Sequence, residues 1–318
     1  MQIDKRMVNK LLALIVLILC QTFASKGQEL YIKTFGEPSA TPVIFLHGGP
    51  GYNCSSFEVT TAQNLADAGF FVIAYDRRGE GRSGAIAEFT FNQSQEDLLG
   101  IMDSLKIESA HLIGHSFGGM LAITLAENFP ERIGSITLVG APVSLQESFK
   151  TIIKTCESIY QEKQDKTNLS YIKMLKGMDS TSVQYSSYCF MHAMQNGFYS
   201  PKSPNQEALA MYKLFRTDSI LKINGSRMGH KQPQGFWKNE AYTTMDLSTN
   251  IEVLREKGLP IFGIYGKEDG LYSQEQIMEL EELLGENKLL YLDDCSHSVF
   301  IDQQKLFIGA LLNFTQKN

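Results

Sequence analysis

The sequence lacks the residue spacings that usually hold a metal ion. It contains five cysteines and six histidines among 318 residues. None of the cysteines forms a C-x-x-C pair, and no histidine pair accompanies such a cysteine pair at the spacing of a zinc site. Structural zinc sites are typically built from such closely spaced pairs. The sequence therefore predicts no metal site.

Basic residues are too few and too scattered to form a stripe that binds nucleic acid. Lysine and arginine number 29 against 35 aspartates and glutamates, which gives a formal net charge of -6. Phosphate-backbone binding needs a concentrated positive field. We therefore expect no nucleic-acid partner.

The one long apolar run is too short to cross a membrane comfortably. Residues 11–20, "LLALIVLILC", follow three basic residues, whereas a spanning helix needs about 20 apolar residues. The pattern is typical of a signal peptide over residues 1–24, with cleavage after Ala24. We expect export to the periplasm or the medium. Lipidation at Cys20 and an uncleaved anchor are the alternatives, and only these would bring membrane contact.

Four cysteines remain after the expected cleavage. An oxidising compartment would allow three full pairings among them, and the sequence does not choose one. A disulfide between Cys156 and Cys189 would staple one segment, while buried free thiols are the alternative. These four residues are Cys54, Cys156, Cys189 and Cys295.

Short apolar runs alternate with helical patterns in two parts of the chain. The runs predict strands at 29–35, 42–47, 70–76, 109–114, 135–140, 259–266 and 287–293. Helical spacing predicts helices at 55–68, 93–105, 117–128, 273–284 and 302–314. This alternation indicates an α/β fold with a mostly parallel central sheet flanked by helices.

The alternation stops between the two parts. Residues 142–248 are richer in polar and aromatic residues, with helical spacing in places and no clear strand. We interpret this segment as a mainly helical cap inserted into one α/β core. The core would then comprise residues 25–141 and 249–318.

A glycine-flanked serine stands where a predicted strand meets a predicted helix. Gly114, Ser116 and Gly118 form G-x-S-x-G, and a sharp turn of this kind holds a hydroxyl exposed and strained. A serine that merely caps the helix is the alternative. The context favours Ser116 as a nucleophile.

The stretch "HGGPG" at 47–51 follows another predicted strand. Glycine lets main-chain N–H groups approach the oxyanion of a tetrahedral intermediate. We expect the Gly49 N–H and the Phe117 N–H, directly after the nucleophile, to form an oxyanion hole.

A serine nucleophile needs a base, and the base needs an acid that orients it. His297 lies in the loop after the last predicted strand, at the sheet edge where ligands bind. Asp269 follows the preceding strand in "YGKEDG", so the order is nucleophile, acid, base. Glu268 is the alternative acid.

A fourth motif, "YDRRGEGRSG" at 75–84, follows the third predicted strand. Asp76 could anchor this loop, with Arg77 or Arg78 as its ion-pair partner. We interpret the motif as scaffold for the pocket wall.

Together these motifs resemble the α/β-hydrolases. The stretches "HGGPG", "DRRGEGRSG", "GHSFGGMLA" and "YGKEDG" and the histidine loop are similar to the prolyl aminopeptidase (proline iminopeptidase) branch in particular. The likeness covers roughly residues 29–141 and 249–318. It implies the same nucleophile, acid, base and oxyanion donors as the residues themselves indicate. The branch commonly has Trp or Tyr after the nucleophile, where this chain has Phe117.

In that branch the cap carries acidic residues that bind the substrate's free amino group. The resemblance makes Glu240, in "FWKNE", a candidate for this substrate-binding role. A solvated glutamate on a helix or loop is the alternative.

These observations lead to one functional hypothesis and two alternatives. We expect a cofactor-independent serine hydrolase that releases an N-terminal residue, proline included, from a short peptide or amide through an acyl-enzyme. A carboxylesterase or lactonase acting on small neutral esters is the alternative enzyme. A non-catalytic binding protein with the same fold is the alternative of another class.

Overall fold

The computed structural model describes residues 30–84 and 87–316. The signal peptide predicted over residues 1–24, with Cys20 and the cleavage site, lies outside the described residues. Within the described ranges, no helix is both long and apolar enough to cross a membrane.

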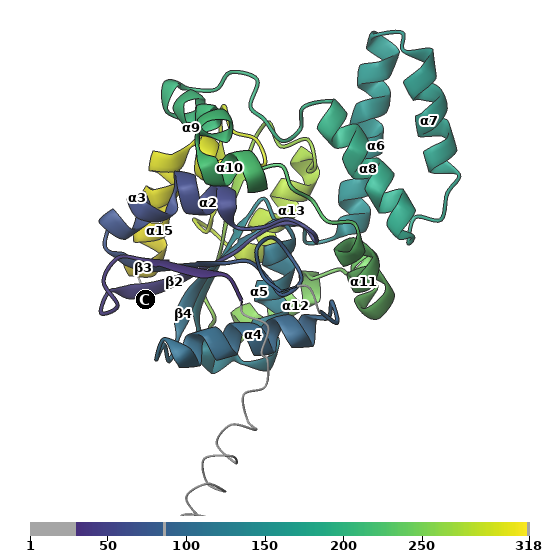
Figure 1. The fold of residues 1–318 in the computed structure, drawn as a ribbon. Helices are drawn as coiled ribbons and strands as arrows, with labels where there is room; N and C mark the ends of the chain where they lie inside the picture. The colour runs from purple at the N-terminus through teal and green to yellow at the C-terminus, as the bar shows by residue number, and fades with distance from the viewer. Residues whose placement is uncertain (1–29, 85–86, 317–318) are drawn as a thin grey trace, which may run out of the picture.

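Seven strands pair into one sheet in the order β1-β3-β2-β4-β5-β6-β7 (Figure 1). β1 pairs antiparallel with β3, and the other neighbours are parallel. All seven predicted strands are confirmed, with ends shifted by a few residues. The strands are β1 (Ile32–Phe35), β2 (Thr41–Leu46), β3 (Phe70–Tyr75), β4 (Ala110–His115), β5 (Ile133–Val139), β6 (Ile261–Gly266) and β7 (Leu289–Leu292).

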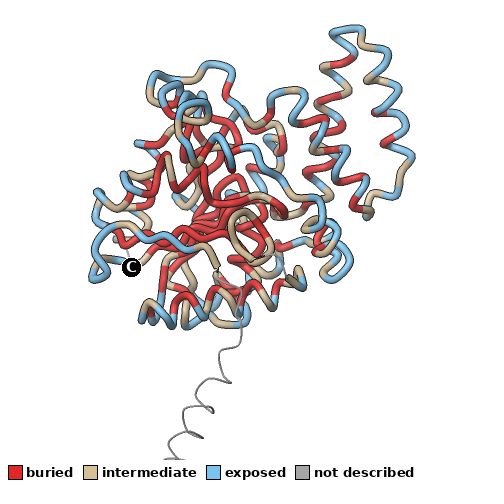
Figure 2. Tube along the Cα trace, viewed as in Figure 1, coloured by how far each residue is buried: buried red, intermediate tan, exposed pale blue. Residues whose placement is uncertain are grey.

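Helices cover both faces of the sheet and form two apolar cores with it. On one face lie α4 (Phe91–Ser104), α5 (Phe117–Asn128), α12 (Ser248–Glu256) and α13 (Gln274–Leu284), with the short η1 (Pro130–Arg132) after α5. On the other lie α2 (Ser55–Thr60), α3 (Ala62–Asp67), α14 (Val299–Asp302) and α15 (Gln304–Gln316). Figure 2 shows the buried strands running through the middle of the molecule. The all-buried β3 and β6 are typical of parallel strands covered on both faces.

The predicted helix 55–68 is broken into α2 and α3, whereas the predicted helix 302–314 corresponds to α15, which a break at its start separates from the short α14. The breaks fall at Thr61 and Gln303, which leave helical geometry. Thr61 Oγ1 donates to Phe300 O at 3.0 Å, and Gln304 Nε2 donates to Thr60 O at 2.8 Å. The breaks therefore join the two helix pairs to each other, which local sequence patterns do not reveal.

Six helices occupy the segment between β5 and α12. They are α6 (Leu145–Glu162), α7 (Lys166–Lys176), α8 (Val183–Gln195), α9 (Gln206–Thr217), α10 (Ser219–Asn224) and α11 (Lys231–Glu240), followed by η2 (Tyr242–Thr244). A bridge between Ser144 and Asp246 joins the two ends of the segment. In Figure 1, α6, α7 and α8 project from the body of the molecule, whereas α9 and α10 lie over α2.

The four cysteines of the described chain are buried free thiols. Burial raises the pKa of Cys156 to about 11 and, with the neighbouring Cys156 charge as a second cause, also raises that of Cys189. The structure thus agrees with the alternative of buried free thiols.

Candidate active site

The chain turns sharply at Ser116, between β4 and α5. Ser116 has φ 52° and ψ -123°, a conformation that is strained for a residue with a side chain. A Cβ on Gly118 would lie 2.0 Å from Leu46 O, and one on Gly114 would lie 2.6 Å from the Gly119 Cα. The two motif glycines are therefore needed because main chain packs directly against them.

His297 meets Asp269 at the carboxyl ends of β6 and β7. Its Nδ1 lies 2.8 Å from Asp269 Oδ2, and both residues are buried. Asp269 Oδ1 accepts a second hydrogen bond, from the Leu271 N–H at 3.1 Å. The two loops are tied together because the Glu268 N–H donates to Cys295 O at 2.8 Å.

Glu268, the alternative acid, points elsewhere. Its Oε2 accepts a hydrogen bond from the Lys202 main-chain N–H. Of the two neighbouring carboxylates, Asp269 is thus the one that contacts His297.

His115 links the serine turn to the histidine loop. Its Nε2 lies 3.1 Å from His297 O, and the two rings lie 4.9 Å apart. Because a carbonyl only accepts, His115 Nε2 carries the proton and donates. Burial, and then the charge of His297, lower the pKa of His115 to about 3, so this ring is neutral.

Because Gly140 has no side chain, there is room beside it for the His297–Asp269 pair. A Cβ there would lie 3.1 Å from His297 Nδ1 and 3.4 Å from Asp269 Oδ2, and φ is 51°. Tyr272 fixes this glycine, since its hydroxyl donates to Gly140 O at 2.7 Å. The glycine that directly follows β5 is therefore a part of the site that sequence reasoning missed.

A buried ion pair holds the 47–51 loop. Arg77 donates to His47 O at 2.5 Å and to Gly48 O at 2.7 Å. Its Nε lies 2.7 Å from Glu80 Oε2, while Glu80 Oε1 accepts from the Gly51 N–H at 2.6 Å. Burial raises the pKa of Glu80, and Arg77 opposes that rise.

The expected pairing of Asp76 with Arg77 or Arg78 is wrong. Asp76 binds Arg82 instead, at 2.7 Å, and Arg78 pairs with Asp97. Burial opposes ionisation of Asp76, but hydrogen bonds from Arg82 and from the Cys54 N–H help to hold its pKa below the usual value. Asp76 does anchor the loop, since it also accepts from the Arg82 N–H at 2.8 Å.

The two expected oxyanion donors lie on the 47–51 loop and at the first residue of α5. Gly49 has φ 122°, and a Cβ there would lie 2.9 Å from the Gly51 N. Phe117 opens α5, where a helix leaves its first N–H groups without intrahelical acceptors. No hydrogen bond engages either N–H among the described residues, so both are available to a ligand.

This architecture matches a known family. Residues 41–304 match the family described as "alpha/beta hydrolase fold". The chain belongs to the α/β hydrolases. The predicted fold class and the family resemblance are therefore confirmed.

Relatives of this α/β hydrolase carry several hydrolase names. It is 27% identical to a proline iminopeptidase of Clostridium botulinum, over 91% of this chain and 95% of that protein. It is 32% identical to a rhodomycin D methylesterase of a Streptomyces species, but there it matches only 38% of that protein's length. A proline iminopeptidase-related protein from Thermus thermophilus shares the fold, with a TM-score of 0.65 at 20% identity over 91% of this chain and 94% of that one. The chain is thus an α/β hydrolase by family, and the names of these relatives differ in the substrate that they give.

Aromatic rings surround the turn and the histidine of this hydrolase. The Phe117 ring packs against Phe236 at 5.0 Å and Tyr242 at 5.6 Å between centroids. The Tyr199 ring stands edge-on to His297 at 5.1 Å. The 142–248 segment therefore contributes three aromatic side chains next to the site.

Glu240 lies at the far side of the same aromatic group. Its Oε1 accepts from the Phe91 N–H at 2.7 Å, at the first residue of α4. The Phe91 ring in turn lies 5.7 Å from that of Phe117. The Glu240 carboxylate therefore lies at the amino terminus of α4. The residue whose N–H it binds, Phe91, packs its ring near that of Phe117, the residue after Ser116.

Proposed function

We propose that this α/β hydrolase releases the N-terminal residue, proline included, from a short peptide or amide. The contact between His297 and Asp269, beside the strained turn at Ser116, is the observation that carries the hydrolytic chemistry. The likeness to proline iminopeptidases along almost the whole chain supports the substrate class.

The proposed mechanism is acyl transfer through Ser116. Because Asp269 accepts from His297 Nδ1, the Nε2 atom is left as the base for the serine hydroxyl. Attack on the scissile carbonyl would give an acyl-enzyme, and water activated by the same imidazole would release the acid. The Gly49 and Phe117 N–H groups would stabilise the oxyanion by about 3 kcal/mol per donor. No cofactor takes part in this scheme.

The proposed acyl site combines apolar rings with one carboxylate. Phe117, Phe236 and Tyr242 offer contact area for an apolar or ring-shaped residue. Glu240, held in place by the Phe91 N–H, would supply the negative charge for the substrate's ammonium group. We propose that Phe91 sets its position.

A neutral-ester substrate is the second candidate. It is favoured by the aromatic character of Tyr199, Phe236 and Tyr242, and by the engagement of Glu240 Oε1 with main chain. An esterase needs no ammonium-binding carboxylate, so this arrangement would suit an uncharged acyl group.

The test compares a prolyl arylamide with its N-acetylated twin, with Ser116→Ala as the blank. The aminopeptidase proposal predicts a kcat/KM at least a hundredfold higher for the free amine. Glu240→Gln should remove most of that preference by raising KM for the free amine alone. Equal or absent turnover of both amides, with ready hydrolysis of a neutral ester, would establish the esterase instead.

We also propose that the protein is exported after cleavage at Ala24. The intact mass of the protein recovered from the medium or periplasm should equal that of a chain that begins at Ser25. A mass that includes residues 1–24, or retention in the cytoplasm, would contradict this.

A further inference from the structure

One carboxylate holds the main chain on both sides of His297. Asp302 Oδ2 accepts a hydrogen bond from the Ser296 N–H at 2.8 Å and another from the Ser296 hydroxyl at 2.6 Å. Ser296 Oγ in turn accepts from the Ser298 N–H at 3.4 Å. Because Ser296 and Ser298 flank His297, the Asp302 side chain restrains the chain directly before and directly after the candidate base.

Asp302 is a buried carboxylate without a counter-ion. It is 1% exposed, and no cationic side chain of the described residues forms an ion pair with it. Burial raises the pKa of Asp302 above its usual value, and the hydrogen bonds from Ser296 and Tyr212 oppose that rise. A buried charge without a cation costs stability. Since such costs are expected mainly at functional sites, we looked for a role of Asp302 in the active site.

The 142–248 segment reaches the same residue. The Tyr212 hydroxyl, on α9, donates to Asp302 Oδ1 at 2.6 Å. Asn205, the N-cap residue of α9, donates through Nδ2 to the main-chain oxygen of Asp302 at 2.9 Å, while its Oδ1 accepts from the Ala208 N–H. α9 is therefore attached to Asp302 at both the side chain and the main chain.

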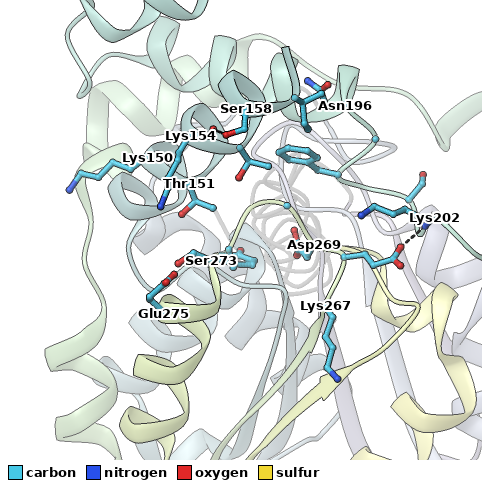
Figure 3. Close-up of a pocket in the computed structure, with 18 residues that line it drawn as sticks. Lys150, Thr151, Lys154, Ser158, Asn196, Lys202, Lys267, Asp269, Ser273 and Glu275 are labelled. Carbon is cyan, nitrogen blue, oxygen red and sulfur yellow. Dashed lines mark hydrogen bonds between the residues drawn. The ribbon is translucent and has the colours of Figure 1, made fainter. Parts of the chain in front are cut away.

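Packing does not surround the partner of His297 on every side. A cavity of about 550 Å³ borders Asp269 (Figure 3). Its walls come from α6, from the 196–202 segment after α8, and from the loop between β6 and α13. Protein interiors are otherwise close-packed, which is what keeps buried side chains in place. Because Asp269 borders open space, hydrogen bonds to the histidine loop contribute more to the position of the pair.

The position of a general base has a large effect on its rate. A misplacement of about 1 Å can cost roughly 10²-fold. His297 stands between Ser296 and Ser298, so a change in their hydrogen bonds would displace the imidazole relative to both Ser116 and Asp269. The restraint on these two serines is therefore a restraint on the base.

We propose that Asp302 is a positioning residue, which keeps His297 in place to take the proton of Ser116, and that Tyr212 couples α9 to this restraint. No hydrogen bond joins Asp302 to the imidazole or to Ser116 among the described residues, so Asp302 acts through the main chain of the histidine loop. The inference rests on the proposed function, because it takes His297 as the base. It adds that α9 contributes to the proton transfer as well as to the architecture of the 142–248 segment.

The test measures the rate at which a fluorophosphonate probe labels Ser116, which requires no knowledge of the substrate. Asp302→Asn and Tyr212→Phe are compared with the wild type. Tyr31→Phe is the matched control, because the half-buried Tyr31 also donates its hydroxyl to a buried carboxylate, that of Glu58 at 3.0 Å, but on α2. We expect labelling about thirtyfold slower in Asp302→Asn, at least threefold slower in Tyr212→Phe, and changed less than twofold in the control.

A double-mutant comparison separates positioning from a general loosening of the fold. Once His297 is replaced by alanine, Asp302 and Tyr212 have no base to position. Adding Asp302→Asn or Tyr212→Phe to His297→Ala should therefore change the residual labelling rate less than twofold. A merely structural role would slow labelling by the same factor in both backgrounds. Circular dichroism checks the fold, and if Asp302→Asn does not fold, Tyr212→Phe, which keeps the carboxylate, decides the test.

Turnover kinetics provide a second readout. With any substrate that the wild type hydrolyses, kcat of Asp302→Asn and Tyr212→Phe should fall while KM changes less than threefold, since the restraint acts on the base and not on substrate contacts.

The outcomes distinguish this inference from the proposed function. Undiminished labelling of Asp302→Asn, or an equal further loss in the His297→Ala background, would overturn the positioning role. Slow labelling of Asp302→Asn with an unaffected Tyr212→Phe would overturn the coupling to α9. A labelled wild type that fails to hydrolyse the prolyl arylamide would count against the aminopeptidase proposal alone, whereas an unlabelled wild type would refute both.

Discussion

Asp269 and His297 are 28 residues apart in the sequence, and their side chains meet at 2.8 Å. Each follows a neighbouring parallel strand, so the carboxyl ends of β6 and β7 bring them to one edge of the sheet. Gly140, at the end of β5, leaves the room in which they meet.

Replacement of the acid should separate the two candidate carboxylates. Asp269→Asn leaves the shape intact but removes the acceptor that sets the tautomer of His297, so we expect kcat to fall about 10⁴-fold. Glu268→Gln should change kcat less than threefold, because Glu268 contacts Lys202 instead. Steady-state kinetics of the two variants measure this, and the reverse order of effects would make Glu268 the acid.

Arg77→Lys should impair the loop that carries Gly49. Lysine keeps the charge but cannot donate in a fork to His47 O and Gly48 O. We expect kcat to fall at least tenfold and the free energy of unfolding to fall by about 2 kcal/mol. Arg78→Lys is the control, because the Arg78 side chain that pairs with Asp97 is partly exposed, and it should cost less than about 1 kcal/mol. Urea unfolding and steady-state kinetics compare the two variants. Equal losses of stability and kcat in both would refute the role of Arg77.

Gly118→Ala should destabilise the protein strongly. The new methyl group would meet Leu46 O, which belongs to the neighbouring strand and has no room to withdraw. A loss of about 3 kcal/mol or more is expected, typical of severe overpacking. Gly100→Ala in α4 is the control, because nothing lies within 4 Å of its Cβ position. That change should stabilise by about 0.5–1 kcal/mol, and a similar melting temperature for both variants would contradict the packing argument.

His115 should make the free energy of unfolding decrease as the pH is lowered. Its pKa is about 3 in the folded protein, because of burial and His297, and about 6.5 when unfolded. Between those values only the unfolded chain binds this proton, so lowering the pH favours unfolding. The loss from this group between pH 7 and pH 5 should be about 2 kcal/mol. His115→Gln should lose that much less stability over the same interval in urea titrations, and an unchanged loss would show that other groups cause it.

The strands were predictable because buried parallel strands are short, continuous apolar runs bounded by glycine and polar residues. The breaks at Thr61 and Gln303 were not, because they depend on hydrogen bonds between α2–α3 and α14–α15. Tertiary contacts there outweigh the local helical pattern.

The candidate site was predictable where a motif demands a backbone geometry, as at Gly118, or where strand order limits the choice, as at His297. The pairing within "DRRGEGRSG" was not, since Arg77, Arg78 and Arg82 are equally suitable partners for Asp76 in sequence. Only the fold directs Arg77 to Glu80 and Arg82 to Asp76.

The central claim is that Ser116 is a nucleophile activated by His297. A fluorophosphonate probe followed by intact-mass and peptide analysis tests it most directly. We predict one adduct, on Ser116, in the folded wild type, none in Ser116→Ala, and labelling at least a hundredfold slower in His297→Ala with the fold intact by circular dichroism. An unlabelled wild type, an adduct on another residue, or undiminished labelling of His297→Ala would contradict the account.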